Sequence, residues 1–122
     1  MSGTKLDLTE FTGTEHYYNY QRSKLTDGIK YMAEVAGAYW LIDVILSHQS
    51  NVIGENFQVW ELKLKENNPE LFKGRNSSHY AVITCDDGNG NEIAKQYIPY
   101  TDFPQDIKIY YIDKVMLLPS EY

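Results

Sequence analysis

The stretch TDGIKYMAEVAGAYWLIDVILSHQS, residues 26–50, decides the fold of this chain. It is long enough to form the central helix of a small domain, and its run at 36–46 is apolar except for Asp43. Apolar surface of this extent is unfavourable in water, so it must be buried against other elements. The stretch therefore predicts helical structure that lies across the core.

Thr26 is placed to cap this helix, and Asp27 lies in its first turn, where a negative charge is favourable. The following apolar residues form one stripe at helical spacing: Ile29, Met32, Ala33 and Ala36. In a straight helix Asp43 would fall on the same buried side. Two alternatives stay open. Either the helix breaks or kinks at Gly37 and turns Asp43 towards water, or its second half is enclosed on all sides.

Beyond residue 51 the apolar pattern changes to the two-residue period of a strand. Trp60, Leu62 and Leu64 alternate with charged residues, which predicts a strand buried on one face. The sequence NPELF, residues 68–72, then predicts a short helical turn.

Further strands are predicted in the last third of the chain. Residues 80–85 and 93–100 predict a hairpin, because the connecting sequence DDGNGN at 86–91 tolerates positive φ angles. Residues 107–111 alternate again and predict a strand that leads into residues 115–118. The C-terminal half thus predicts an antiparallel sheet of about four strands.

The segment before residue 26 carries helical signals. Residues 6–11 predict a short helical turn, and Thr14 is placed to cap a helix over residues 15–21. The predicted fold class is therefore α+β, with N-terminal helices packed on one face of the C-terminal antiparallel sheet.

Length and composition bound the organisation and the class of protein. A chain of 122 residues fits a single domain, with a helical part at 1–50 and a sheet part at 51–122. No secretory signal or membrane span is indicated, so we expect a soluble, cytoplasmic protein. The lone cysteine, Cys85, agrees with a reducing compartment. A formal net charge of −6 disfavours direct nucleic-acid binding.

Tyrosine is unusually frequent, with 11 in the chain. Its large apolar ring and polar hydroxyl suit half-buried positions and contact surfaces alike. One interpretation is ordinary packing with wet hydroxyls, and the other is a tyrosine-lined groove or dimer face. The candidate binding residues are Tyr17, Tyr18, Tyr20, Tyr39 and Trp40.

No catalytic constellation is evident. Asp43 is the leading catalytic candidate, since burial would raise the pKa of a carboxylate among apolar residues. His16 or His48 would be its acid–base partner. The alternative is that Asp43 is exposed, or bonded to a tyrosine hydroxyl or to Arg22 for structural reasons.

Metal and thiol chemistry receive little support from the sequence. The histidines show no metal-binding spacing. The series Asp87, Asn89 and Asn91 resembles the start of a calcium loop, but the later glycine and glutamate of such a loop are missing. Neighbouring aspartates would raise the pKa of Cys85, which disfavours a reactive thiolate. We expect no metal site and no cofactor.

Two segments carry a resemblance to a known family: LTEFTGTEHYYNY at 8–20 and LTDGIKYMAEVAGAYWLIDVILSHQ at 25–49. They resemble a bacterial and phage-associated family called domain of unknown function 6876. The words FTGTE and AGAYWLID are the most distinctive, and VWELKL at 59–64 is similar but less specific. The resemblance implies a small bacterial or mobile-element protein with an accessory role, and it supplies no activity or functional residue.

Three functional hypotheses follow. The first is a non-enzymatic module that binds an unknown protein partner through a tyrosine-rich surface and forms a homodimer. The second is a small enzyme that uses Asp43 with His16 or His48. The third is an acidic mimic of DNA that inhibits a DNA-binding protein, although such a mimic needs its carboxylates in an ordered row.

Overall fold

The computed structural model describes residues 6–122 and places two α-helices within a set of seven strands. Of the four short 3₁₀ helices in these residues, three lie in the connections and the fourth, Pro119–Glu121, follows the last strand. In chain order the main elements are β1 (Tyr17–Tyr20), β2 (Ser23–Thr26), α1 (Asp27–Val35), α2 (Tyr39–Ser47), β3 (Phe57–Leu64), β4 (Ala81–Asp86), β5 (Glu92–Ile98), β6 (Ile107–Ile112) and β7 (Val115–Leu117).

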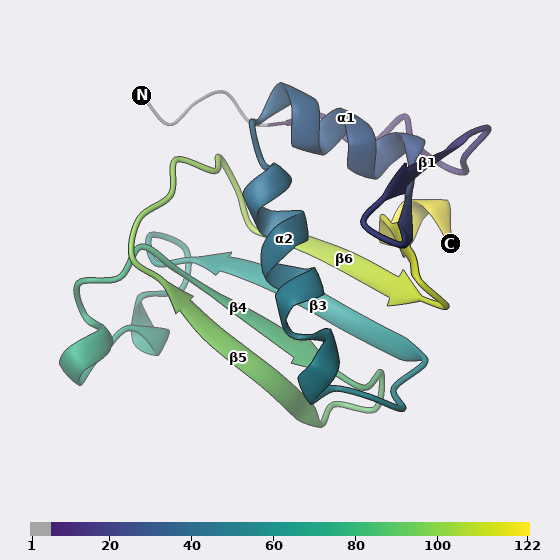
Figure 1. The fold of residues 1–122 in the computed structure, drawn as a ribbon. Coiled ribbons are helices and arrows are strands. Elements are labelled where there is room, and N and C mark those ends of the chain that lie inside the picture. Colours follow the sequence, from purple (N-terminus) through teal and green to yellow (C-terminus); the bar gives the residue numbers. More distant parts are fainter. Residues whose placement is uncertain (1–5) are drawn as a thin grey trace.

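All seven strands belong to one sheet in the order β1-β2-β7-β6-β3-β4-β5. The neighbours β2 and β7 run parallel, and the other neighbours run antiparallel. Figure 1 shows α2 crossing one face of this sheet, with α1 at its upper end. The α+β character is confirmed, but the prediction of about four antiparallel strands behind N-terminal helices is wrong. The sheet is mixed, and the helices lie between β2 and β3.

The two strands that were not predicted, β1 and β2, lie within residues 17–26. The predicted helix at 15–21 is instead β1 and the start of a hairpin, and residues 6–11 contain a turn closed by the Phe11 N–H on the Leu8 carbonyl. The β1–β2 turn consists of Gln21 and Arg22, which have φ angles of 46° and 68°. Such turns are usually marked by glycine or asparagine, so the sequence carried no turn signal.

The strands after residue 51 follow the predicted alternation. Along β3 the residues alternate strictly between half-buried and buried, with Trp60, Leu62 and Leu64 facing the helices. The hairpin of β4 and β5, the strand β6 and the short 3₁₀ helix Pro69–Leu71 are also where the patterns predicted them. A two-residue period is sufficient here because one face of the sheet is buried.

The helical stretch breaks at Gly37. This residue has a φ angle of 60°, and the Ala38 N–H donates to the Ala33 carbonyl at 2.8 Å, which closes α1 in a Schellman arrangement. Of the two alternatives for the second half, the break is the one observed. It turns α2 so that Leu41 and Ile42 are buried while Asp43 is exposed.

The N-terminus of α1 is capped from a distance. Thr26 occupies the predicted cap position, but its hydroxyl donates to Glu121 at 2.6 Å instead of capping the helix. Glu121 also accepts the Gly28 N–H at 2.9 Å, and Thr14 Oγ1 accepts the Asp27 N–H at 2.8 Å. The two ends of the described chain are thereby joined to the first turn of α1.

Candidate functional site

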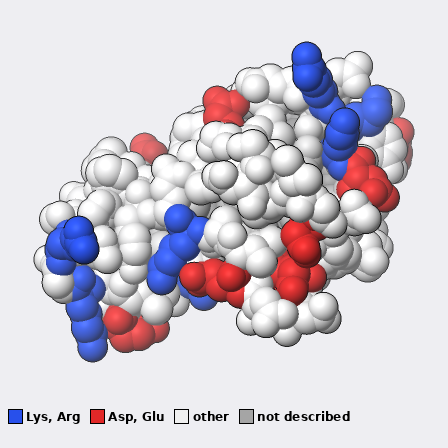
Figure 2. Space-filling model, turned by 60° about the horizontal axis from the view of Figure 1, so that its bottom comes forward, with Lys and Arg blue, Asp and Glu red and all other residues white. Residues whose placement is uncertain are grey.

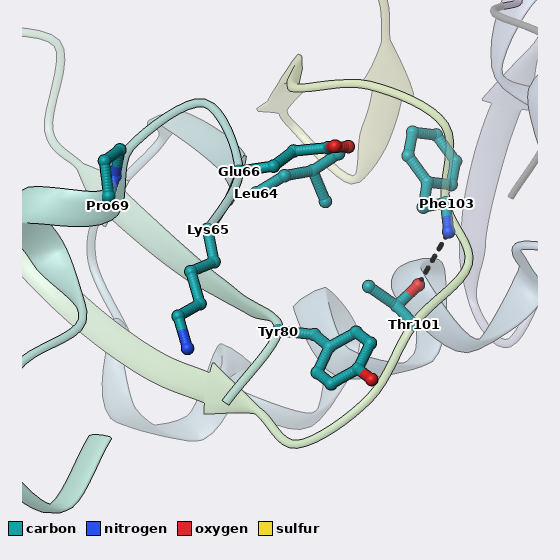
Figure 3. A pocket seen from close by; sticks show the side chains of 7 residues that line it. All are labelled: Leu64, Lys65, Glu66, Pro69, Tyr80, Thr101 and Phe103. Atoms are coloured by element: carbon teal, nitrogen blue, oxygen red, sulfur yellow. Dashed lines mark hydrogen bonds between the residues drawn. The ribbon is translucent and has the colours of Figure 1, made fainter. Parts of the chain in front are cut away.

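A pocket of about 600 Å³ lies at the end of the sheet where β3 ends and β4 begins (Figure 3). It is formed mainly by two irregular connections, residues 65–80 and 99–106. Connections of this length in a small domain are commonly functional. The lining residues are Leu64, Lys65, Glu66, Pro69, Tyr80, Thr101 and Phe103.

The pocket has an apolar base and a polar rim. Leu64 and Phe103 are buried, whereas Glu66 and Tyr80 are exposed. In Figure 3 the Glu66 side chain extends across one side towards Phe103, and Lys65 extends along the other side. The Phe103 N–H donates to Thr101 Oγ1 at 3.0 Å, which holds the 101–103 segment in shape. This combination of an apolar base with a few polar groups is typical of ligand pockets.

Asp106 holds the first pocket loop in place. Its carboxylate accepts hydrogen bonds from the Leu64 N–H at 2.8 Å, Asn68 Nδ2 at 2.8 Å and Asn67 Nδ2 at 3.2 Å. Burial of Asp106 opposes its ionisation, but these hydrogen bonds, the Leu64 bond foremost, outweigh it and lower the pKa. The loop is therefore fixed by an ionised carboxylate.

Tyr97 holds the remainder of that loop. Its hydroxyl donates to the Leu71 carbonyl at 2.8 Å, and its ring lies edge-on to Phe72 with centroids 5.5 Å apart. Lys65 Nζ donates to the Ser77 carbonyl. These contacts make the pocket largely preformed, which reduces the ordering cost of binding.

Two tyrosines lie together at this end of the sheet. Tyr80 is 50% exposed and Tyr100 is 67% exposed, and their ring centroids are 4.8 Å apart. Among residues 6–122 neither hydroxyl has a hydrogen-bond partner. Such an aromatic pair offers both a large contact area and two free polar groups to a ligand.

A second hollow, of about 350 Å³, is less suited to binding. The polar side chains at its base, Gln49 and Gln58, bond each other reciprocally at 2.9 Å. Gln58 also bonds Trp60 and the Glu55 carbonyl. Because these amides already use their donors and acceptors inside the protein, they have little to offer a ligand.

The tyrosines predicted to form a binding surface are mostly engaged within the molecule. Tyr18 donates to Asp27 at 3.0 Å and Tyr20 donates to Asp43 at 2.7 Å. These carboxylate hydrogen bonds raise the pKa of both tyrosines. The structure also places Tyr20 against Tyr39, Trp40 half-buried on the core, and Tyr17 56% exposed.

The three predicted catalytic residues have separate hydrogen-bond partners. Asp43 accepts from Tyr20 and from Gln21 Nε2 at 3.3 Å. His48 Nε2 lies 2.7 Å from Gln96 Oε1, and His16 Nδ1 lies 3.8 Å from Asp27. Within the part of the chain that the structure describes, no hydrogen bond or ion pair joins Asp43 to either histidine.

The remaining candidates from the sequence are explained by structural roles. Asp87 accepts from the Asn89 N–H at 2.9 Å and from Asn91 Nδ2 at 3.0 Å, which shapes the β4–β5 turn. Burial, aided by the charge of Asp86, raises the pKa of Cys85 to about 12. Over residues 6–122, no cluster of three or more His, Cys, Asp or Glu side chains could hold a metal ion.

The pocket was not predicted from the sequence. Its residues come from the ends of β3, β4 and β5, and only strand pairing brings them together. One signal was present: aromatic residues at or just beyond the ends of the predicted strands 80–85 and 93–100, namely Tyr80, Tyr100 and Phe103.

No helix in residues 6–122 combines the length and the hydropathy needed to span a bilayer. No curated protein and no solved structure matches the chain. A family model does match, over residues 2–122, and its description is family of unknown function (DUF6876). The expected resemblance is thereby confirmed at the level of the family, and the chain belongs to this family of unknown function.

Proposed function

We propose that this protein is a non-enzymatic binding module that receives an apolar side chain of a partner protein in the pocket between residues 65–80 and 99–106. The observation that carries the proposal is the exposed pair of Tyr80 and Tyr100 at a preformed pocket with an apolar base. Tyrosines in such positions are frequent energetic centres of protein interfaces. The binding surface thus differs from the one expected around Tyr18 and Tyr20.

The chemistry of the pocket favours binding over catalysis. Its charged groups, Lys65 and Glu66, lie on the rim, while Leu64 and Phe103 form the base. An enzyme that uses Asp43 needs His16 or His48 within hydrogen-bond reach, and the contacts of these residues lie elsewhere. The acid–base enzyme is therefore not our proposal.

The charge distribution disfavours the hypothesis that the protein is a mimic of DNA. On the face shown in Figure 2, Asp and Glu side chains are interspersed with Lys and Arg. A mimic of the phosphate backbone requires an ordered row of negative charge. The proposal includes an accessory role in a bacterium or its phages. It also includes a homodimer as the working form.

The proposal is tested with N-acetyl-tryptophanamide as a probe, observed by NMR of the labelled protein. We expect dissociation constants of about 1–10 mM, which suit one buried side chain, and shifts confined to Leu64, Thr101 and Phe103. Tyr80→Ala and Tyr100→Ala should each weaken binding severalfold. Tyr17→Ala is the matched control, because Tyr17 is an exposed tyrosine on β1. Shifts centred on β1, or no shifts in the pocket, would refute the proposal.

A further inference from the structure

The strand β5 forms one edge of the sheet. It pairs with β4 from Ala81 to Asp86, and the structure gives it no strand on its other side within residues 6–122. Figure 1 shows β5 as the outermost strand. Alternate residues along this seven-residue edge therefore turn backbone donors and acceptors outward, where an added strand can pair with them.

The opposite edge of the sheet is a poorer acceptor. The strand β1 has four residues and ends in the strained turn of Gln21 and Arg22. A short edge strand is a common protection against unwanted pairing. The longer edge, β5, is the one open to a partner.

The positive charge of Lys95 limits which segments can pair with β5. It is the central residue of the strand, it is exposed, and its Nζ lies 5.6 Å from the centre of the Tyr97 ring on the same face. If two copies paired antiparallel over all seven residues, Lys95 would stand opposite Lys95. Like charges in this position are destabilising, whereas an opposite charge is favourable. The edge therefore disfavours a second copy and favours a segment with an acidic residue facing Lys95.

The edge also leads to the pocket. Tyr100 lies two residues beyond the end of β5, and its ring contacts Tyr80, which lines the pocket. The aromatic pair and the pocket therefore lie next to the C-terminal end of the edge strand.

We infer that β5 accepts an extended segment of a partner protein as an eighth strand, with an acidic residue facing Lys95 and an apolar side chain entering the pocket. The inference rests on the proposed binding function and specifies its ligand. Main-chain hydrogen bonds give such complexes affinity, and alternate side chains give them specificity.

The test uses three capped peptides in which valine and threonine alternate around a central residue, with a tryptophan near one end. The central residue is glutamate, glutamine or lysine. We expect the glutamate peptide to bind about threefold more tightly than the lysine peptide. Lys95→Glu should reverse this order, and the matched control Lys24→Glu, an exposed lysine on the distant strand β2, should preserve it. Hydrogen exchange should slow at β5 amides.

The outcomes separate the two proposals. If the tryptophan probe binds the pocket but no peptide slows exchange in β5, the inference on β5 is overturned and the pocket stands. Equal affinity for all three peptides, unchanged by Lys95→Glu, overturns it as well. If neither probe nor peptide perturbs Leu64, Thr101 and Phe103, the proposed function itself fails.

Discussion

Glu121 takes the capping role at α1 that a local side chain usually performs. Its carboxylate accepts hydrogen bonds from Thr26 Oγ1, the Gly28 N–H and the Leu118 N–H, at 2.6, 2.9 and 3.0 Å. A negative charge at this end of a helix is also favourable. The cap could not be foreseen, because its residues are distant in sequence.

Glu121→Ala should lower the free energy of unfolding by about 1–2 kcal/mol, the usual effect of losing a helix cap. Urea unfolding monitored by circular dichroism measures it. Glu10→Ala serves as the control, since Glu10 is exposed and has no hydrogen-bond partner among the described residues. A loss no larger than that of the control would contradict the capping role.

Gly28 is required by the close approach of the C-terminal segment. A Cβ atom there would lie 2.6 Å from Leu118 Cδ1 and 2.8 Å from Glu121 Oε1. Alanine normally stabilises a helix by about 1 kcal/mol relative to glycine. We predict the opposite sign here, a loss of about 1–3 kcal/mol typical of overpacking. The unfolding free energy of Gly28→Ala is measured by chemical denaturation. Gly13→Ala is the control, because a Cβ atom at Gly13 would have nothing within 4 Å.

At the scale of elements, two hairpins turn on residues with unfavourable backbone angles. Asp113 and Lys114 join β6 to β7 with φ angles of 49° and 65°, as Gln21 and Arg22 join β1 to β2. Arg22→Gly and Lys114→Gly should each raise the unfolding free energy by about 1 kcal/mol, because glycine relieves the left-handed conformation. Lys108→Gly within β6 should lower it. Melting temperatures that fall in all three would show the turns to be unstrained.

The pocket loops should respond to acid through Asp106. Because its pKa is lowered in the folded state, its contribution to stability is complete above the ordinary value of 3.8 and is lost as pH falls through the folded-state pKa. Asp106→Asn should cost about 1 kcal/mol at pH 7 and less near pH 2, measured by urea unfolding at both values. An equal loss of stability at both pH values would show that the charge of Asp106 is not the cause.

The elements that could be predicted are those with a one-sided burial pattern. β3 and the β4–β5 hairpin were predicted because Trp60, Leu62 and Leu64 alternate with charged residues and because DDGNGN signals a turn. β1 and β2 were missed, since YYNYQRSKLT has neither a clear alternation nor a glycine in its turn. The pocket was missed for a different reason: its residues meet only through strand pairing.

At the scale of the molecule, the sheet face opposite the helices carries an aromatic cluster. Phe57, Tyr110 and Tyr122 lie in mutual contact, with ring centroids 5.2–5.8 Å apart. Glu61 and Lys108 stand opposite each other on the neighbouring strands β3 and β6, so a two-fold related copy would meet both signs of charge. This face is where we place the proposed homodimer.

Light scattering should give a mass about twice the 14.2 kDa of one chain, and Tyr110→Glu should reduce it to that of one chain, because a buried unpaired charge opposes association. Tyr17→Glu is the control. A strictly monomeric wild-type protein would rule out the dimer, while the pocket proposal would be unaffected.

The parallel pairing of β2 with β7 also bears on how the chain folds. Pairing Lys24 with Val115 closes a long loop of chain. The conformational entropy lost in closing it is compensated only by the contacts made when both strands are in place. Topologies of this kind fold slowly for their size. Expressed separately, residues 1–50 and residues 51–122 should both stay unfolded, because the first would lack β7 beside β2 and the second would lack the helices that cover its sheet.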